Sequence, residues 1–285
     1  MPTKRTVTPL IYIGNKTDML DTIATNLPVA VHDRRWVMPF GGSLAPVLHF
    51  RPERAVITDN CGEVMHFWRQ LRDKPKKVLK LAAKLLQLTG DLETSYYKVR
   101  DQIREINAAG IEGPERAAHF LVINRFGWRG LWRVNRKGEC NVPFSNPRAR
   151  NGKLPDRDLV LSVSKYLRGG GIELAEEGYE VTLSRPIFPA EDFLHADPPY
   201  HGTSYSYQGM SAEAFDTLDQ IRLAQMLHNS GAPYMAHNKP TKLTRQAYRH
   251  ARQIEFGVTR NVRNGKTLKR ACSELIATSA GYAPR

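Results

Sequence analysis

The sequence has few cysteines and no long apolar run. Its three cysteines, at positions 61, 140 and 272 of 285, are odd in number and far apart, so they form neither a disulfide framework nor the ligand spacing of a zinc site. No apolar stretch approaches the roughly 18 residues that span a membrane, and the first residues do not lead into the hydrophobic core of a signal peptide. We therefore expect a cytoplasmic protein with no metal, no disulfide and no membrane segment.

Acidic residues are scarce relative to basic ones. The chain carries 42 Lys and Arg against 28 Asp and Glu, a net charge of +14, while its apolar content of 41% is ordinary for a folded protein. This composition argues against a disordered chain, a collagen and a coiled coil.

The positive charge is concentrated in two windows. Residues 119–153 hold eight Lys or Arg against Glu139 alone, and residues 239–270 hold ten against Glu255 alone. Clustered cations favour a polyanionic partner, with nucleic acid first, because they displace condensed counterions when they meet phosphates. A solvated basic surface is the alternative interpretation.

Hydrophobic periodicity predicts an α/β fold with a helical middle. Short apolar segments predict strands at 37–40, 55–59, 180–183, 193–196 and 234–236, and the first of these runs into a glycine turn. Apolar residues three and four apart predict helices within 77–88 and 96–106. A further helix is expected at about 211–228, with Ser211 as its N-cap. The order indicates one α/β domain interrupted by an insert.

Asp197, Pro198, Pro199 and Tyr200 follow the strand expected at 193–196. The two prolines remove two N–H donors, so the Pro198 carbonyl can face a ligand without competition from a local amide. Asp197 places a carboxylate beside it, and the Tyr200 ring can stack on a planar base. Together they suit a nucleobase amine, while a proline-rich strand end with a helix-capping aspartate is the alternative.

With this tetrapeptide the sequence resembles the Dam-type DNA adenine methyltransferases, a family that uses S-adenosylmethionine. The likeness covers nearly the whole chain, with cofactor motifs first, a target-recognition insert second and the catalytic tetrapeptide third. The motifs that carry it are residues 12–16, 39–43, 59, 124–144, 192–193, 197–200 and 243–275.

The resemblance implies a Rossmann-like sheet with helices on both faces, plus a mostly helical target-recognition insert with a β-hairpin. The catalytic domain is expected to comprise residues 1–68 and 169–285. The insert is expected to comprise residues 69–168, with its hairpin at about 125–144.

The resemblance also assigns a cofactor site. The glycine turn would let S-adenosylmethionine approach the backbone closely, Asp59 would meet the ribose hydroxyls, and Asp192 would accept the adenine amine of the cofactor. The residues expected to bind the cofactor are Tyr12, Lys16, Pro39, Phe40, Gly41, Gly42, Ser43, Asp59, Asp192 and Phe193.

Two positions depart from the family pattern. Leu44 stands where the family has a second glycine, and Cys61 stands where it has an asparagine. We expect Leu44 to tighten or displace the cofactor turn and to weaken cofactor binding.

The insert combines cations with large aromatics, as insertion into stacked bases requires. The resemblance assigns guanine readout to Arg133, contacts with neighbouring bases to Leu131 and Pro143, and entry into the duplex to Trp128, beside Arg129 in place of a family asparagine. The expected DNA-binding residues are Arg125, Trp128, Arg129, Leu131, Arg133, Asn135, Lys137 and Pro143. A GATC-like target is the default, the second basic window is expected to meet phosphates, and a core hairpin with solvated arginine tips is the alternative.

The sequence therefore predicts transfer of a methyl group from S-adenosylmethionine to the N6 amine of an adenine flipped out of duplex DNA, with Asp197, Pro198 and Tyr200 as catalytic residues. Restriction–modification or phage biology would suit such an enzyme. We expect a monomer, with two copies on one DNA site as an alternative. The competing functions are a DNA-binding module of the same fold with weakened or lost catalysis, and a methyltransferase acting on RNA or on a protein amide.

Overall fold

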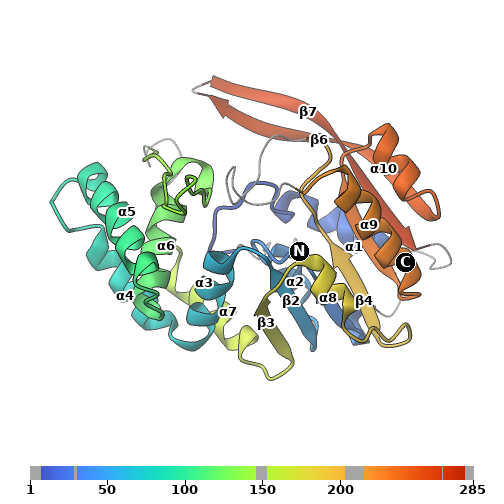
Figure 1. Cartoon of the computed structure of the whole chain (residues 1–285), viewed down its shortest axis with the longest axis horizontal. Helices are drawn as coiled ribbons and strands as arrows, with labels where there is room; N and C mark the ends of the chain where they lie inside the picture. The colour runs from blue at the N-terminus through green and yellow to red at the C-terminus, as the bar shows by residue number, and fades with distance from the viewer. Residues whose placement is uncertain (1–7, 29–30, 146–152, 203–214, 265, 280–285) are drawn as a thin grey trace, which may run out of the picture.

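The computed structural model describes residues 8–28, 31–145, 153–202, 215–264 and 266–279. Within these ranges seven strands form one sheet in the order β3-β2-β1-β4-β5-β7-β6 (Figure 1). Neighbouring strands are parallel from β3 to β5, and β7 runs antiparallel between β5 and β6. The strands are β1 (Arg35–Met38), β2 (Ala55–Asp59), β3 (Ile172–Glu176), β4 (Asp192–Ala196), β5 (Tyr234–Asn238), β6 (Ala251–Asn264) and β7 (Lys266–Ser279). The predicted α/β class is confirmed.

Helices lie on both faces of this sheet and beside it (Figure 1). The α-helices in the described ranges are α1 (Leu20–Asn26), α2 (Ala45–Phe50), α3 (Gly62–Asp73), α4 (Pro75–Leu85), α5 (Leu92–Ala108), α6 (Pro114–Phe126), α7 (Arg157–Leu167), α8 (Tyr179–Ser184), α9 (Thr217–Asn229) and α10 (Lys242–Ala247). Short 3-10 turns are η1 (Thr17–Met19), η2 (Val31–Asp33) and η3 (Trp128–Gly130). None of the described helices is long and apolar enough to cross a membrane.

Alternating side chains along each strand supply two cores. On one face Trp36 and Phe193 pack with side chains of α1, α2 and α3. On the other face Val37 and Leu194 pack with α8, α9 and α10. This alternation follows from the two-residue period of a strand, which sends successive side chains to opposite faces.

The helices α4 to α7 lie beside the sheet and share the core of the α3 face. The central helix α6 is buried nearly all round, with residues 117–124 all buried. A helix without a polar face needs neighbours on every side, and α3, α4 and α5 provide them. The packing therefore joins these helices to the sheet through one continuous core.

The strand predicted at 180–183 is wrong. These residues lie in the short helix α8, where Tyr179 and Thr182, three positions apart, face the core while Val181 is 58% exposed. The Thr182 hydroxyl bonds the Gly178 carbonyl at 3.1 Å, as a helical residue can. The missing strand is β3, an edge strand in which only Leu174 is buried, so apolar patterning gave little signal for it.

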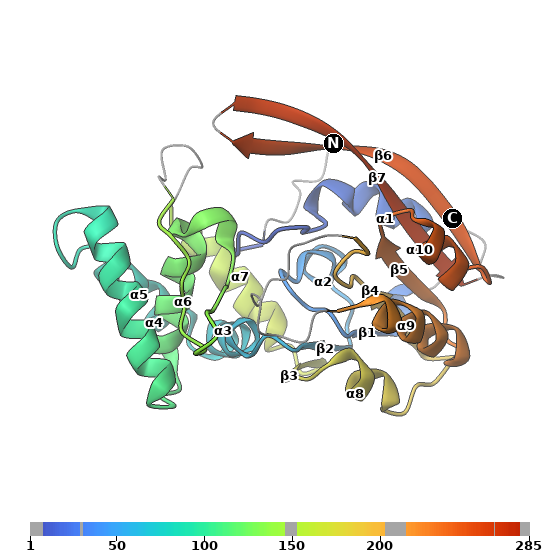
Figure 2. The ribbon, with the colours of Figure 1, turned by 45° about the horizontal axis from the view of Figure 1, so that its top comes forward.

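Helix α9, which follows β4 in the chain, and the strands β6 and β7, which follow β5, also differ from expectation. Helix α9 begins at Thr217, where Asp216 and Asp219 form a capping box, while the predicted cap Ser211 lies outside the described residues. The C-terminal strands β6 and β7 pair over 14 positions. Their hairpin extends beyond the sheet toward the side that carries α5 and α6 (Figures 1 and 2).

Candidate active site

The order of the strands places the candidate site at the carboxyl ends of β1 and β4. Strand β1 pairs with β2 on one side and with β4 on the other, so chain connections leave in opposite directions at this point. In open parallel sheets ligands bind in the crevice that such a reversal creates. The glycine turn after β1 and the tetrapeptide after β4 both begin here.

Asp59 organises the glycine turn. Its carboxylate accepts the Gly42 N–H at 2.9 Å and the Cys61 N–H at 2.9 Å. The side chain is buried, and burial raises the pKa of Asp59 above its usual range while these two N–H groups act to lower it. Cys61 therefore contributes its backbone N–H to the site, a contact that does not depend on which side chain stands there.

Gly42 lies where the chain leaves no room for a side chain. Its φ is +48°, and a Cβ there would lie 3.0 Å from the ring of Tyr12. Its carbonyl accepts the indole N–H of Trp68 at 2.9 Å. The N-terminal segment, α3 and the glycine turn thus meet at one residue, and only glycine fits this combination of φ and close approach.

Leu44 adopts a left-handed backbone conformation, which glycine adopts without strain. Its φ of 55° and ψ of 14° are left-handed, which costs a leucine about 1–2 kcal/mol. Its side chain is fully buried in the core of the α3 face. The residue therefore retains a left-handed turn and directs its bulk into the core.

Lys16 meets the tetrapeptide from the N-terminal segment. Its ammonium lies 2.6 Å from Asp197 Oδ2 and donates to the Gly14 carbonyl at 2.8 Å. It also lies 5.1 Å from the centre of the Tyr200 ring. Lys16 is 2% exposed and Asp197 is 23% exposed, so the carboxylate has a buried cation on one side and reaches solvent on the other.

The tetrapeptide is anchored to α9 and β5. Gln220 donates to the Pro199 carbonyl at 2.7 Å and accepts from the Asn238 amide at 2.7 Å. Asn238 in turn accepts the His201 N–H at 3.0 Å. No donor within the described residues reaches the Pro198 carbonyl, so it keeps its capacity to accept a hydrogen bond.

Two histidines lie buried below Lys16. His195 of β4 and His237 of β5 are fully buried, with their Nε2 atoms 3.1 Å apart. Burial, aided by the charge of Lys16, lowers the pKa of His195 to about 3, and burial together with His195 and Lys16 lowers the pKa of His237 well below its usual range. Both rings are therefore neutral near pH 7 and add no charge beneath the Lys16–Asp197 pair. Their positions in apolar strands gave no signal in the sequence.

An aromatic cluster flanks the glycine turn. Phe40 stacks on Tyr179 of α8, with ring centres 5.8 Å apart and planes 19° apart. Phe215 meets Phe40 edge-on at 5.6 Å. The sequence reasoning missed Tyr179 and Phe215 because it expected a strand at 180–183 and relied on motifs elsewhere.

Asp192 lies at the opposite edge of the sheet from these residues, since it begins β4 whereas Asp197 follows its end. Arg35 binds both carboxylate oxygens at 2.8 Å, and the Phe188 N–H adds a third bond at 2.8 Å. Phe193 is fully buried against Trp36. The structure therefore does not bring Asp192 and Phe193 together with the other predicted cofactor residues.

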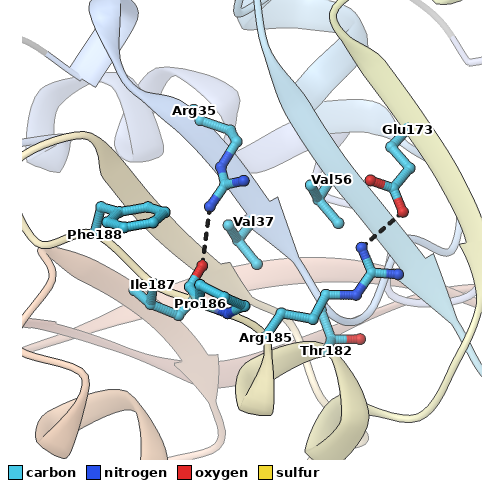
Figure 3. Close-up of a pocket in the computed structure, with 9 residues that line it drawn as sticks. All are labelled: Arg35, Val37, Val56, Glu173, Thr182, Arg185, Pro186, Ile187 and Phe188. Atoms are coloured by element: carbon cyan, nitrogen blue, oxygen red, sulfur yellow. Dashed lines mark hydrogen bonds and ion pairs between the residues drawn. The ribbon is translucent and has the colours of Figure 1, made fainter.

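A cavity of about 300 Å³ lies next to Arg35 (Figure 3). Its second arginine, Arg185, forms ion pairs with Glu173 at 2.6 Å and with Glu177. The guanidinium groups that line it are thus already paired with carboxylates, and the remaining lining is mostly apolar. Within the described residues no cluster of His, Cys, Asp or Glu could hold a metal ion.

The expected DNA-binding residues follow the chain from the end of α6. Two antiparallel bridges, Gly127 to Phe144 and Val134 to Cys140, draw this segment into a narrow hairpin. Arg133, Lys137 and Pro143 are exposed. The guanidinium of Arg129 lies over the Trp128 ring at 4.9 Å, with φ of Arg129 at 59°.

Other residues of the expected DNA-binding set stabilise the folded hairpin and its surroundings. Arg125 donates to the Lys153 carbonyl at 2.7 Å, and burial lowers its pKa. Leu131 is 7% exposed. Asn135 accepts the N–H groups of Lys137 and Glu139, which shapes the turn of the hairpin. The structure thus divides the predicted set into an exposed group and a supporting group.

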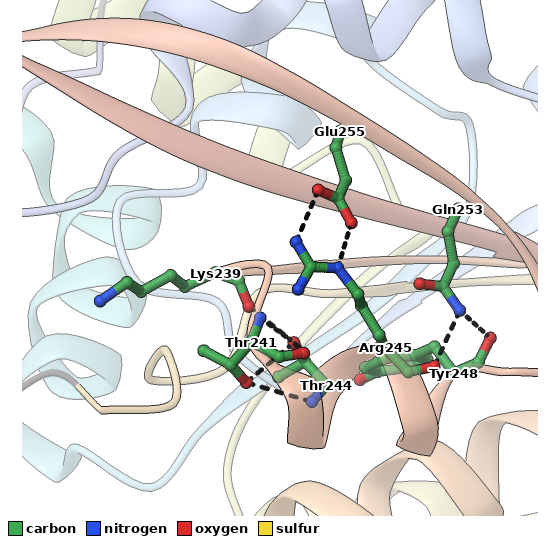
Figure 4. A network of polar contacts seen from close by, with 7 residues as sticks. All are labelled: Lys239, Thr241, Thr244, Arg245, Tyr248, Gln253 and Glu255. Carbon is green, nitrogen blue, oxygen red and sulfur yellow. Dashed lines mark hydrogen bonds and ion pairs between the residues drawn. The ribbon is translucent and has the colours of Figure 1, made fainter.

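The second basic window begins where hydrogen bonds and an ion pair connect α10 to β6 (Figure 4). Thr241 and Thr244 form a capping box at the start of α10. Arg245 holds Glu255 of β6 through two bonds of 2.6 and 2.9 Å, and Gln253 donates to the Arg245 carbonyl at 2.9 Å. These contacts fix the base of the β6–β7 hairpin against α10. The side chains of residues 258–272, which hold five of the ten cations of this window, lie outside the described part of the molecule.

The N-terminal segment connects the hairpin with the catalytic edge. Asn124 donates to the Ile11 carbonyl at 2.8 Å and accepts the Ile11 N–H at 2.9 Å. A Cβ on Gly130 would lie 2.5 Å from the Ile11 carbonyl oxygen. Five residues further along the chain, Lys16 binds Asp197.

Proteins with similar sequences are named as DNA adenine methylases or as Type II methyltransferases. The family model of D12 class N6 adenine-specific DNA methyltransferases matches residues 12–262. The chain is 28% identical over 281 residues to the Type II methyltransferase M1.LlaDCHI of Lactococcus lactis subsp. cremoris, covering 95% of this chain and 94% of that protein. It is 26% identical over 275 residues to the Retron Ec67 DNA adenine methylase of Escherichia coli, with 95% and 91% covered. It is also 26% identical over 274 residues to the DNA adenine methylase of Vibrio cholerae serotype O1, with 94% of each chain covered.

Proposed function

Since the chain belongs to the D12 class N6 adenine-specific DNA methyltransferases, we propose that it methylates N6 of an adenine flipped out of duplex DNA, with S-adenosylmethionine as the methyl donor. The observation that carries the proposal is the geometry after β4. There a partly exposed carboxylate, an unengaged carbonyl and an aromatic ring follow one another within four residues, at Asp197, Pro198 and Tyr200.

The residues at the carboxyl edge fit a purine-containing methyl donor. The left-handed turn at Gly42 brings the backbone close to the Tyr12 ring, the Phe40 ring offers a flat apolar face, and Asp59 supplies a buried carboxylate at the end of β2. We propose that Tyr12, residues 39–43 and Asp59 hold the cofactor. When bound, S-adenosylmethionine supplies an electrophilic methyl group on a sulfonium. Asp192 and Phe193 are left out of this site because Arg35 already holds the carboxylate at the other edge.

The chemistry depends on making a weak nucleophile stronger. The lone pair of the adenine amine is delocalised into the ring, and its two hydrogens need acceptors that draw the nitrogen toward a tetrahedral geometry. Asp197 and the Pro198 carbonyl would accept one hydrogen each and stabilise the positive charge that develops on nitrogen. Tyr200 would hold the base by stacking, which contributes about 1–3 kcal/mol toward the few kcal/mol that flipping costs.

Lys16 supports this arrangement by orienting the Asp197 carboxylate. Its buried ammonium lies 2.6 Å from Asp197 Oδ2, and a charge-assisted hydrogen bond of this kind fixes the position of the carboxylate. The prediction from the resemblance gave Lys16 to the cofactor. We propose instead that the main role of Lys16 is to bind the catalytic carboxylate of Asp197.

For target recognition we propose that the insert, at 69–168, reads a short GATC-like site through Arg133, Trp128 and Pro143. The parts of the chain at 1–68 and 169–285 would form the catalytic domain. The second basic window would hold phosphates, which position a protein on DNA without reading its sequence. The enzyme would act as a monomer on double-stranded DNA.

Replacement of the catalytic carboxylate tests the function. Asp197→Ala should abolish incorporation of radiolabelled methyl groups into duplex DNA while DNA affinity stays within a few fold, because phosphate contacts dominate affinity. Methyl transfer by this variant at the wild-type rate would overturn the assignment.

Two further measurements separate the alternatives. Calorimetry with S-adenosylmethionine distinguishes an enzyme from a DNA-binding module of the same fold, which would not bind the cofactor. Parallel incorporation assays with duplex DNA and with RNA distinguish the two substrates, and we expect activity on DNA alone.

A further inference from the structure

Arg133 and Asn141 face each other across the hairpin. The Asn141 N–H donates to the Arg133 carbonyl at 3.0 Å, and the Val134–Cys140 bridge closes the next position toward the turn. At the turn Asn135 accepts two backbone N–H groups and donates to Glu139 at 2.8 Å. The backbone that carries Arg133 is thus fixed from both directions.

The side chains of the pair interact along one edge of the guanidinium. Arg133 Nε donates to Asn141 Oδ1 at 2.7 Å, and Arg133 Nη2 donates to the Asn141 carbonyl at 3.0 Å. A guanidinium presents its five N–H groups in a planar fork, and these two bonds use the edge between Nε and Nη2. The end edge, between Nη1 and Nη2, meets no acceptor within the described residues. Arg133 is exposed, so this edge faces solvent.

Two other arginines of the hairpin, Arg129 and Arg125, are held differently. Arg129 lies flat over the Trp128 ring. Arg125 turns inward to the Lys153 carbonyl. In the part of the hairpin that the structure describes, Arg133 combines a fixed side edge with an open end edge. That is the geometry needed for two parallel hydrogen bonds to the O6 and N7 acceptors of a guanine in the major groove.

We propose that Asn141 is a specificity-positioning residue, which holds the Arg133 guanidinium ready to read guanine before DNA binds. This inference rests on the proposed function, since it assumes that the hairpin reads duplex DNA. An unrestrained arginine loses rotamer freedom when it binds DNA, and this loss lowers affinity. Asn141 instead orders the Arg133 side chain when the protein folds, and it holds this side chain in the conformer that reads guanine.

The test compares a guanine with its N7-deficient analogue. Duplexes carry GATC, or the methylated site found by single-molecule sequencing of DNA from expressing cells, and 7-deazaguanine replaces one guanine at a time. Methyl incorporation gives kcat/KM on each duplex for the wild type, Arg133→Ala, Asn141→Ala and Asn141→Asp. The readout is the ratio between natural and deaza substrates for each variant, which does not depend on the fraction of enzyme that is folded.

At one guanine we expect the wild type to prefer the natural base about tenfold, within the range of a bidentate contact, and Arg133→Ala to lose the preference. Asn141→Ala should lower kcat/KM on the natural duplex about fivefold, the range of one immobilised side chain, and reduce the preference to about twofold. Asn141→Asp keeps the acceptor for Nε, so it should restore the preference while raising KM on every duplex, because a carboxylate repels phosphates.

The outcomes separate this inference from the proposed function. A tenfold preference retained by Asn141→Ala would overturn the role of Asn141 while leaving guanine readout by Arg133 intact. Equal preferences for the wild type and Arg133→Ala at every guanine would overturn the readout and the positioning role together. Absence of any methyl incorporation by the wild type would overturn the proposed function itself.

Discussion

Two buried carboxylates at opposite edges of one sheet, Asp59 and Asp192, show how differently the same group can be satisfied. Asp59 ends β2 at the carboxyl edge and, among the described residues, accepts hydrogen bonds only from the backbone N–H groups of Gly42 and Cys61. Asp192 begins β4 at the amino edge and is bound at both oxygens by Arg35. The first carboxylate shapes two loops and has no counter-cation among the described residues, whereas the second completes a structural ion pair. The contrast indicates that ligand-binding capacity belongs to the carboxyl edge.

The largest expected effect is on stability at the amino edge. Asp192→Asn should lower the free energy of unfolding by about 3 kcal/mol, at the low end for breaking a buried pair because Arg35 still reaches solvent. Urea denaturation measures the loss, and calorimetry should find the affinity for S-adenosylmethionine within twofold of the wild type. A large loss of cofactor affinity with unchanged stability would reverse the roles of the two edges.

Acid should weaken the carboxyl edge through its neutral histidines. His195 has a pKa of about 3 in the folded protein and about 6.5 when unfolded, so the unfolded state binds more protons between these values. Stability is therefore present above pH 6.5 and is lost as pH falls, by about 2 kcal/mol from this residue between pH 7 and pH 5.

Urea midpoints measured from pH 7 to pH 5 test this dependence. The variant His195→Asn should lack this part of the pH dependence, although the acidic groups shared with the wild type will still contribute. Equal slopes for the two proteins would show that His195 is not held neutral by burial.

Asp59→Asn should weaken cofactor binding about tenfold, a loss near 1.4 kcal/mol. The amide NH2 cannot accept a hydrogen bond, so one of the N–H groups from Gly42 and Cys61 loses its partner and the glycine turn shifts. Calorimetry with S-adenosylmethionine measures the change, and Asp192→Asn is the matched control at the other edge. Unchanged affinity in Asp59→Asn would remove Asp59 from the proposed cofactor site.

The smallest effect is expected at an ion pair with the same fork geometry on the surface. Arg245 binds Glu255 through Nε and Nη2, as Arg35 binds Asp192, but the two partners are 50% and 39% exposed. Glu255→Gln should leave the urea midpoint nearly unchanged, because water screens the pair. A loss as large as that of Asp192→Asn would mean that geometry, rather than burial, decides the strength of these pairs.

The two carboxylates also show what the sequence could and could not predict. After a buried strand, a glycine turn followed by an acidic residue is typical of a nucleotide-binding sheet. Asp59 was accordingly predicted at a strand end, where the structure has it. The family resemblance also assigned Asp192 to the cofactor site. Its partner Arg35 is 157 positions away, and local sequence patterns carry no information about such a distant ion pair. The class of the sheet and the position of the tetrapeptide followed from local signals.

Other features needed the three-dimensional arrangement. The contact between Lys16 and Asp197 joins the N-terminal segment to the end of β4, and the pair of His195 and His237 depends on which strands are neighbours. The segment at 180–183 alternates like a strand, but packing selected the helical spacing of Tyr179 and Thr182. Local propensity is a weak guide where tertiary contacts decide between two short elements.

The attachment of the hairpin to Ile11 limits how the recognition element could be exchanged between enzymes. Asn124 and Gly130 both meet the backbone of Ile11, and every amino acid except proline offers the same N–H and carbonyl groups. The contact therefore depends little on the side chain at position 11, provided that Asn124 and Gly130 are kept. A library that varies the exposed residues Arg133, Lys137 and Pro143, while keeping the buried side chains of the hairpin, could retarget the enzyme without rebuilding its catalytic half.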